Sequence, residues 1–221
     1  MLSTANSVVS VSSGLDEKLA SLVSAMPPHF VVPNGVNIAV IEDGESLRTR
    51  EIVEKRNSSN IFGYVGHLTS SWFDWPLLLS AAQALPDVEF EIVGHGLPKE
   101  LDLPPNLTYL GPKTHEELRD IVGNWRAGLI PFADVPLTRS VDPNKIYEYQ
   151  AWGLRTLSAP MGMVKQYPST WVYRGKEQFV HVIKEILNSP ITIEEVQALE
   201  QFVHGCTWHE RAKQMRRILD F

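Results

Sequence analysis

The chain has 221 residues, of which 43% are hydrophobic and 21% are charged, a composition typical of soluble globular proteins. Its net charge of -6 and the absence of a long basic run argue against a nucleic-acid partner. The single cysteine excludes an internal disulfide framework and favours a reducing compartment. The first residues lack the pattern of a signal peptide, and no apolar run approaches the roughly 18 residues that a membrane span needs. We therefore expect a cytoplasmic protein, and leave open a peripheral association at the inner face of the membrane.

The first part of the chain predicts a small unit of its own. Residues 7–11 have the pattern of a short buried strand, and Ser13 with Asp16 resembles a capping box that begins a helix. A second short strand is expected at residues 30–32, followed by a turn at residues 33–35. Residues 42–59 are polar and predict a connecting segment with some helix.

From Ile61 onward, apolar strands alternate with amphipathic helices. Strands are expected at residues 61–65, 88–93, 107–109, 127–132 and 155–158, and helices at residues 76–85, 114–123, 176–187, 192–202 and from 207 onward. Strands and helices that alternate over short loops predict βαβ units and a parallel sheet. The expected fold is an α/β, Rossmann-like, doubly wound parallel sheet with helices on both faces and a helical C-terminus.

The most informative stretch is residues 140–153, where a proline opens and a glycine closes a short helical pattern. Lys145 and Glu148 are three residues apart, so both side chains lie on one face of the helix. A lysine beside the free N–H groups of a helix N-terminus suits a phosphate, and a carboxylate one turn later can accept hydrogen bonds from sugar hydroxyls. A solvated ion pair would explain the same two charges, and the pattern alone does not decide between the two interpretations.

Other candidate features are weaker. Glycines follow three of the predicted strands, at Gly66, Gly94 and Gly111, where ligands of open α/β sheets bind, but no dinucleotide or P-loop fingerprint is present. His204, Cys206 and His209 lack the spacing and the fourth ligand of a zinc site. The aromatic cluster at residues 72–75 more often covers a core than stacks on a sugar.

Four cations lie on the last predicted helix, at Arg211, Lys213, Arg216 and Arg217. A solvated basic face is the simpler interpretation of this cluster, because the dipole favours cations at a helix C-terminus. Contact with anionic lipid or with a neighbouring domain is the alternative.

The pattern Ser-x-Asp-Pro-x-Lys-x-Tyr-Glu-Tyr-x-Ala-x-Gly at residues 140–153 resembles the donor-site motif of GT-B glycosyltransferases of the bacterial surface-polysaccharide type. Residues 64–66, 92–96, 106–111 and 207–208 resemble further segments of that family in the same order, and residues 33–36 resemble the turn between its two domains. The resemblance implies that residues 1–36 are a remnant of an acceptor domain and that residues 37–221 bind a nucleotide-sugar donor.

The resemblance implies a role for each candidate site residue. Glu148 would bind the ribose and Lys145 would neutralise the diphosphate, as the candidate for stabilising the leaving phosphate. Gly66 and His67 would approach the phosphates or the sugar, and Gly111 and Pro112 would border the base. Asp142 and Tyr147 belong to the same motif, and Arg139 would add positive charge. The implied reaction transfers a sugar, without metal or cofactor, from a nucleoside-diphosphate sugar (UDP rather than GDP or dTDP) to a glycan or lipid-linked acceptor.

Two departures from the family pattern keep other functions open. Ser140 stands where many relatives have an acidic residue, and His67 stands where they often carry Arg and Lys nearby. These departures motivate a non-catalytic nucleotide-sugar-binding or partner-docking module as the alternative to an enzyme. A generic α/β domain would leave the Lys145 and Glu148 face unexplained. In either of the first two cases the acceptor side would come from a missing N-terminal domain or a partner chain.

Overall fold

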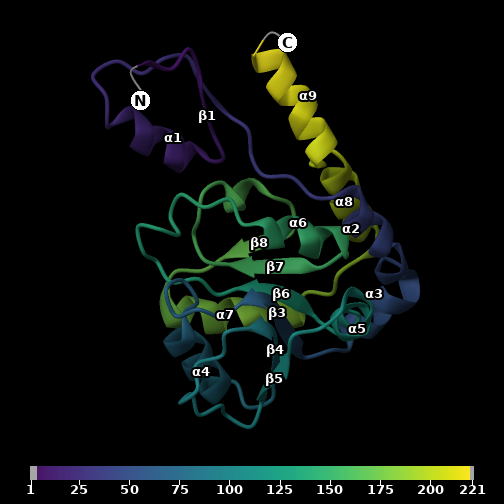
Figure 1. Cartoon of the computed structure of the whole chain (residues 1–221). Coiled ribbons are helices and arrows are strands. Elements are labelled where there is room, and N and C mark those ends of the chain that lie inside the picture. Colours follow the sequence, from purple (N-terminus) through teal and green to yellow (C-terminus); the bar gives the residue numbers. More distant parts are fainter. Residues whose placement is uncertain (1–3, 220–221) are drawn as a thin grey trace.

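A six-stranded parallel sheet forms the centre of the protein in the computed structural model, which describes residues 4–219 (Figure 1). Its strands are β3 (Ile61–His67), β4 (Glu89–His95), β5 (Leu107–Gly111), β6 (Ala127–Ile130), β7 (Arg155–Ser158) and β8 (Thr170–Val172). The spatial order is β5-β4-β3-β6-β7-β8. The chain therefore winds outward from β3, returns to lay β6 beside it, and winds outward the other way. The doubly wound α/β fold expected from the sequence is confirmed.

Helices cover both faces of this sheet. The helices that follow the N-terminal unit are α2 (Ile38–Asp43), α3 (Arg50–Asn57), α4 (Trp75–Ala84), α5 (His115–Val122), α6 (Asn144–Ala151), α7 (Gly175–Asn188), α8 (Ile193–His204) and α9 (Trp208–Ile218), of which α9 extends away from the sheet. Successive strand residues face opposite sides. On one side of β3, Tyr64 packs edge-on against Phe73, just before α4, and α4 in turn contacts α7. On the other side, Tyr149 of α6 lies under the sheet and reaches both β3 and β6.

A small N-terminal unit stands apart from the main sheet. It consists of β1 (Val8–Ser10), α1 (Ser13–Ala20) and β2 (His29–Val31), with β1 and β2 paired in parallel as a two-stranded sheet. Figure 1 shows this unit and α9 above the six-stranded sheet, at opposite sides of the molecule's upper end. None of the helices in residues 4–219 is long and apolar enough to cross a membrane.

Several local predictions need correction. The N-cap of α1 is Ser12 rather than Ser13, because the Ser12 hydroxyl accepts from the Leu15 backbone N–H at 3.1 Å. The strand expected at 127–132 ends at Ile130. Helix α2 and strand β8 were not predicted, because at six and three residues they are too short for a periodic pattern. The capping box of Thr114 and Glu117 at the start of α5 is confirmed.

Tyr149 bridges β3 and β6 at the centre of the sheet. Ladder pairing of β3 with β6 covers only Phe62–Gly63 against Ala127–Gly128. Beyond that point the Tyr149 hydroxyl accepts from the Val65 N–H at 3.2 Å and donates to the Leu129 carbonyl at 3.1 Å. The ring has room because position 128 is a glycine, whose Cβ would lie 2.5 Å from the Tyr149 ring.

We expect Tyr149→Phe to lower the free energy of unfolding by about 3 kcal/mol, because a buried N–H and a buried carbonyl lose their shared partner. Tyr109→Phe is the matched control. Its half-buried hydroxyl donates only to the Gly94 carbonyl, at 2.7 Å, so that its loss should cost about 1 kcal/mol. Urea unfolding followed by circular dichroism measures both. Equal losses in the two variants would contradict the bridging role of Tyr149.

Candidate functional site

A pocket of about 450 Å³ opens where β3 and β6 end. This is the point at which the strand order reverses, and ligands of open α/β sheets bind there, beyond the carboxyl ends of the strands. The pocket is lined by Asn34, Tyr64, Gly66, His67, Trp72, Phe132, Leu137, Thr138, Val141, Asp142, Pro143, Asn144 and Lys145. The structure thus brings together Gly66, His67, Asp142 and Lys145 of the predicted site, from two segments that lie far apart in the chain.

Helix α6 presents its N-terminus to this pocket. Its N-cap is Pro143, which has no side chain that could accept from the first backbone N–H groups of the helix. Pro143, Asn144 and Lys145 all line the pocket. Uncapped N–H groups beside a lysine ammonium form a place where negative charge is stabilised. The helix ends as expected, with Gly153 just beyond it at φ +67°.

Lys145 and Glu148 form the ion pair that their spacing predicts. The Lys145 Nζ lies 2.7 Å from the Glu148 Oε2, and the two side chains are 27% and 26% exposed. Such partly exposed pairs contribute roughly 0–1 kcal/mol. Burial raises the pKa of Tyr64, and the negative charge of Glu148 raises it further. Because Tyr64 lines the pocket, the Glu148 carboxylate lies close to the pocket wall. A ligand could therefore replace this ion pair at little cost in free energy.

Glycines occupy the ends of β3 and β4, at positions where a Cβ would collide with neighbouring atoms. Gly66 has a φ of +156°, and a Cβ there would lie 2.6 Å from the Tyr64 hydroxyl oxygen. Gly94, its partner in the register, has a φ of +139°, and a Cβ there would lie 1.7 Å from the Gly66 carbonyl oxygen. The next residue, His67, is exposed, and its ring centroid is 6.0 Å from that of Trp72. The space beside these two glycines is thus filled by protein atoms, and the accessible group at the end of β3 is the His67 imidazole.

Asp142 and Tyr147 form a buried network under the pocket. Asp142 is 2% exposed, and its carboxylate accepts from the hydroxyls of Tyr147 and Tyr167 at 2.8 and 2.7 Å. The same carboxylate accepts from the Asn34 backbone N–H at 2.7 Å. Burial, and then the charge of Asp142, raise the pKa of Tyr147. This network orders the loop that leads into α6, while a direct contact of Asp142 or Tyr147 with a ligand stays a prediction.

Five predicted site residues lie outside the pocket lining, namely Gly111, Pro112, Arg139, Tyr147 and Glu148. Arg139 is exposed, and its Nε donates to the Asp134 carboxylate at 2.7 Å. Gly111 is the last residue of β5, the edge strand two positions from β3, and Pro112 follows it. Their assignment to the base stays a prediction.

The apolar wall of the pocket was not predicted from the sequence. Phe132, Leu137 and Val141 were not selected, because single apolar residues in a loop carry no periodic signal. The aromatic residues at 72–75 have two different roles: two of them belong to the core at the start of α4, as expected, and one faces the pocket. Phe73 and Trp75 are buried at 2% and 4% exposure, whereas Trp72 lines the pocket.

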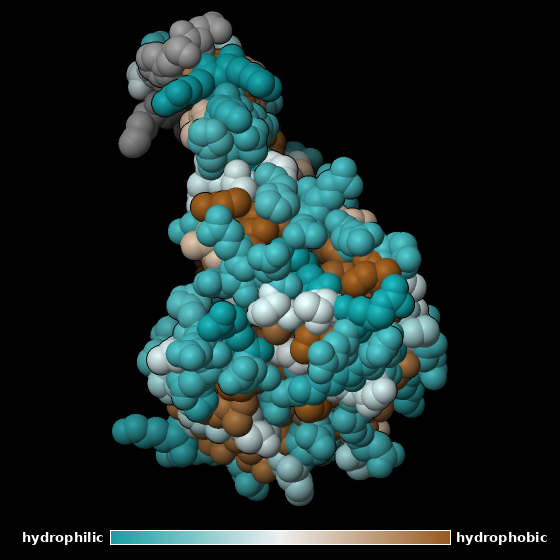
Figure 2. Space-filling model, turned by 90° about the vertical axis from the view of Figure 1, so that its right-hand side faces the viewer, coloured by the Kyte–Doolittle hydropathy of each residue, from teal (hydrophilic) through white to brown (hydrophobic). Residues whose placement is uncertain are grey.

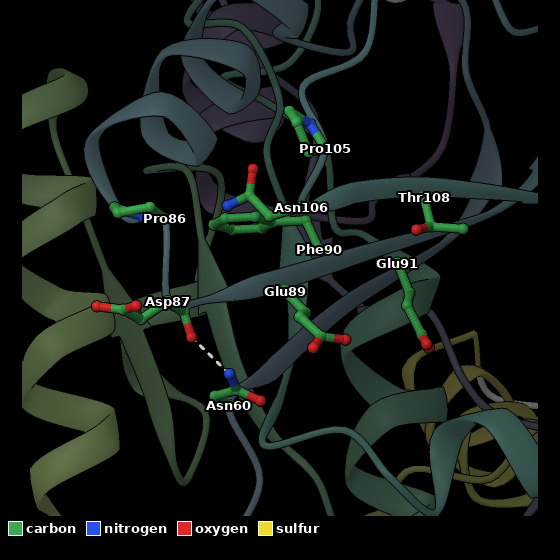
Figure 3. A pocket seen from close by; sticks show the side chains of 9 residues that line it. All are labelled: Asn60, Pro86, Asp87, Glu89, Phe90, Glu91, Pro105, Asn106 and Thr108. Carbon is green, nitrogen blue, oxygen red and sulfur yellow. Dashed lines mark hydrogen bonds between the residues drawn. The ribbon is translucent and has the colours of Figure 1, made fainter.

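A second hollow, of about 630 Å³, lies near the amino ends of β3, β4 and β5 (Figure 3). Figure 3 shows the carboxylates of Asp87, Glu89 and Glu91 along it, and its lining contains no cationic side chain. This chemistry does not suit a phosphate. Within residues 4–219, no group of three His, Cys, Asp or Glu side chains is arranged to hold a metal ion.

Comparison with known proteins identifies the architecture. No family model matches the chain. It is 24% identical over 192 residues to a Bacillus subtilis (strain 168) protein provisionally named as the teichuronic acid biosynthesis glycosyltransferase TuaH, covering 84% of this chain and 45% of that protein. It is 25% identical over 125 residues to the UDP-glucuronate:glycolipid 2-beta-glucuronosyltransferase of Xanthomonas campestris pv. campestris, covering 55% of this chain and 31% of that protein.

Solved structures agree over almost the whole chain. Anabaena HepE in complex with UDP and glucose matches with a TM-score of 0.71 at 15% identity, covering 99% of this chain and 64% of HepE. The lipopolysaccharide outer core galactosyltransferase WaaB matches with a TM-score of 0.71 at 16% identity, covering 97% of this chain and 62% of WaaB. The chain has the fold of one half of a GT-B glycosyltransferase.

This GT-B half spans less than half the length of the two relatives that it matches by sequence. The relatives and the matched structures include proteins named for teichuronic acid and lipopolysaccharide, two bacterial surface polysaccharides. The resemblance found in the motif at residues 140–153 is therefore confirmed at the level of the fold.

We expect Asp142→Asn to lower the free energy of unfolding of this GT-B half by about 2 kcal/mol, because three donors lose a charged acceptor and an amide NH₂ must face one of them. Asp134→Asn makes the same chemical change in an exposed pair with Arg139 and should leave the stability close to that of the parent. Thermal unfolding checks both variants. If both melt like the parent, Asp142 does not hold the loop.

Proposed function

We propose that the chain is the donor-binding half of a glycosyltransferase that transfers a hexose from a nucleoside-diphosphate sugar, with UDP as the favoured nucleotide. The observation that carries this proposal is the pair of Lys145 and Glu148 on α6, beside a pocket at the reversal of the strand order. A cation that is weakly paired and an acceptor carboxylate one turn away are the two groups that a ribosyl diphosphate requires.

Lys145 is the group that stabilises the leaving phosphate in this proposal. Departure of a nucleoside diphosphate from the anomeric carbon leaves negative charge on the β-phosphate. An ammonium and the uncapped N–H groups of α6 stabilise this charge without a metal ion. Glu148, released from its ion pair, accepts from the ribose hydroxyls. The exchange costs little, because the pair it breaks is partly exposed.

The remaining assignments follow the direction of the strands. Gly66 and His67 adjoin the phosphates or the sugar, because both line the pocket at the end of β3. Gly111 and Pro112 border the base, and Arg139 adds positive charge when it exchanges Asp134 for a phosphate. Support for UDP comes from HepE, whose solved structures contain UDP and UDP-glucose.

Transfer also requires an acceptor-binding wall. The chain covers 45% and 31% of its two sequence relatives, and a cleft needs two walls to orient the reactants and to exclude water. We propose that an N-terminal half or a partner chain supplies this wall and binds a glycan or lipid-linked acceptor on the cytoplasmic side.

Isothermal titration calorimetry with UDP, GDP, dTDP and ADP tests the donor site. We expect UDP to bind most tightly, and Lys145→Ala to weaken its binding roughly tenfold through loss of a charge-assisted contact. Lys213→Ala is the matched control, because the Lys213 Nζ lies 2.7 Å from Glu210 in the same i,i+3 arrangement on α9, away from the pocket. UDP should bind this control as it binds the parent.

Two results would refute the donor site. If none of the four nucleotides binds at millimolar concentration, the chain has no nucleotide site, because a Kd above about 1 mM corresponds to less than about 4 kcal/mol of binding free energy. Undiminished UDP binding in both Lys145→Ala and Glu148→Ala would place the site elsewhere. Adding an acceptor-binding half and measuring release of UDP from UDP-sugar then separates the enzyme from a non-catalytic binding module.

A further inference from the structure

The pocket at the ends of β3 and β6 has two chemically different parts. Asn144, Lys145 and the uncapped N–H groups of α6 form a polar part, which the proposed function assigns to the diphosphate. The apolar wall of Phe132, Leu137 and Val141 forms the other part, and most of the surface of the pocket is apolar. A diphosphate makes no use of such a wall, so another part of the ligand must account for it.

The direction of α6 relates the wall to the donor sugar. In a nucleoside-diphosphate sugar, the ribose and the transferred sugar are attached to opposite ends of the diphosphate. Glu148, the proposed ligand of the ribose, lies three residues beyond Lys145 along α6, which is about one turn. The transferred sugar therefore extends the other way, toward the loop that precedes α6 and contains Leu137 and Val141. This step rests on the proposed function.

The polar side chains beside the wall are already hydrogen-bonded within the protein. The Thr138 hydroxyl is buried, lies within hydrogen-bond distance of the Ala133 and Val135 carbonyls, and accepts from the Val135 N–H at 3.2 Å. The Asp142 carboxylate accepts from the three donors described above. A sugar hydroxyl that faced the wall would lose its contact with water and gain no partner, which is unfavourable.

The wall is held in place by contacts on both sides. The Phe132 ring packs edge-on against Tyr64, with 6.3 Å between the ring centroids. The backbone N–H of Ala133 donates to the Trp72 carbonyl at 2.7 Å, and the N–H of Val141 donates to the Thr138 carbonyl at 3.0 Å. An apolar group can therefore bind against a surface that is already formed, and the cost of ordering that surface has been met by folding.

Leu137 is the accessible part of the wall, because its side chain belongs to a residue that is 60% exposed. Exposed apolar residues are common on protein surfaces and need no function. Figure 2 shows the side of the molecule that carries α3 and α5, where hydrophobic areas are separated by hydrophilic ones. Leu137 differs from such residues because it lines the same pocket as Lys145 and the start of α6.

We infer that the transferred sugar carries a methyl group, in an acetamido substituent or at a 6-deoxy position, and that this methyl group packs against Leu137 and Val141. A methyl group gains free energy on leaving water and needs no hydrogen bond, whereas a hydroxyl in the same place loses one. Asn144 and His67 are exposed, line the pocket and remain for the hydroxyls of the sugar. The apolar wall thus selects the donor by a substituent that takes no part in the transfer.

Isothermal titration calorimetry with UDP, UDP-glucose, UDP-N-acetylglucosamine and UDP-6-deoxyglucose tests this inference. The last two sugars each differ from glucose in one substituent. The affinity for each UDP-sugar is divided by the affinity of the same protein for UDP, so that the contribution of the sugar is isolated. We expect one of the two methyl-bearing sugars to exceed UDP-glucose by about tenfold. Which of the two it is identifies the acetamido or the 6-deoxy position.

Leu137→Asn should reduce this preference to about twofold or less, because an amide can form a hydrogen bond with a hydroxyl. Val141→Thr, which keeps the shape of the side chain and adds a hydroxyl, should reduce it as well. Leu22→Asn is the matched control, because Leu22 is 66% exposed and lies outside the pocket lining. This control should keep the tenfold preference of the parent.

Two results separate this inference from the proposed function. If UDP binds but UDP-glucose binds as tightly as both methyl-bearing sugars, the inference is wrong while the donor site stands. The inference is also wrong if Leu137→Asn and Val141→Thr both keep the full preference. If UDP and all three UDP-sugars fail to bind, the proposed function fails, and the inference fails with it.

Discussion

The Tyr149 hydroxyl is the contact on which the site depends, because it lies where β3 and β6 stop pairing. It holds the Val65 N–H and the Leu129 carbonyl, each of which would otherwise be a buried polar group without a partner. The strands can therefore separate beyond the last pair of the ladder without a loss of hydrogen bonds. The same side chain ties α6 to the sheet, so the opening between the strands and the helix beside it are set by one residue.

The pocket combines two kinds of support that differ in strength. The Asp142 network beneath it is rigid, because its side chains are buried and hydrogen-bonded to one another. The pair of Lys145 and Glu148 is partly exposed and weakly held. This division suits a binding site, since the frame keeps its geometry while the charged groups exchange one partner for another. The cost of binding then falls on an interaction that contributes little to folding.

Features that depend on the local spacing of residues were predicted from the sequence. The alternation of strands and helices, the caps of α5, α8 and α9, and the position of Lys145 and Glu148 on one face all follow from spacing. The contact of Asn34 with Asp142 joins residues 108 apart and leaves no local trace. The apolar pocket wall consists of single residues from separate loops, which no periodicity reveals. Short elements such as α2 and β8 fall below the length at which a pattern can be detected.

The turn between the N-terminal unit and α2 connects the pocket to the projecting helix. Asn34 donates from its backbone to the Asp142 carboxylate beneath the pocket, and its carbonyl accepts from Arg211 on α9. Two residues later, the backbone of Val36 forms hydrogen bonds with the residues on either side of Thr207. These contacts are short, largely backbone-borne and partly buried, so they fix the base of α9 relative to the start of α6.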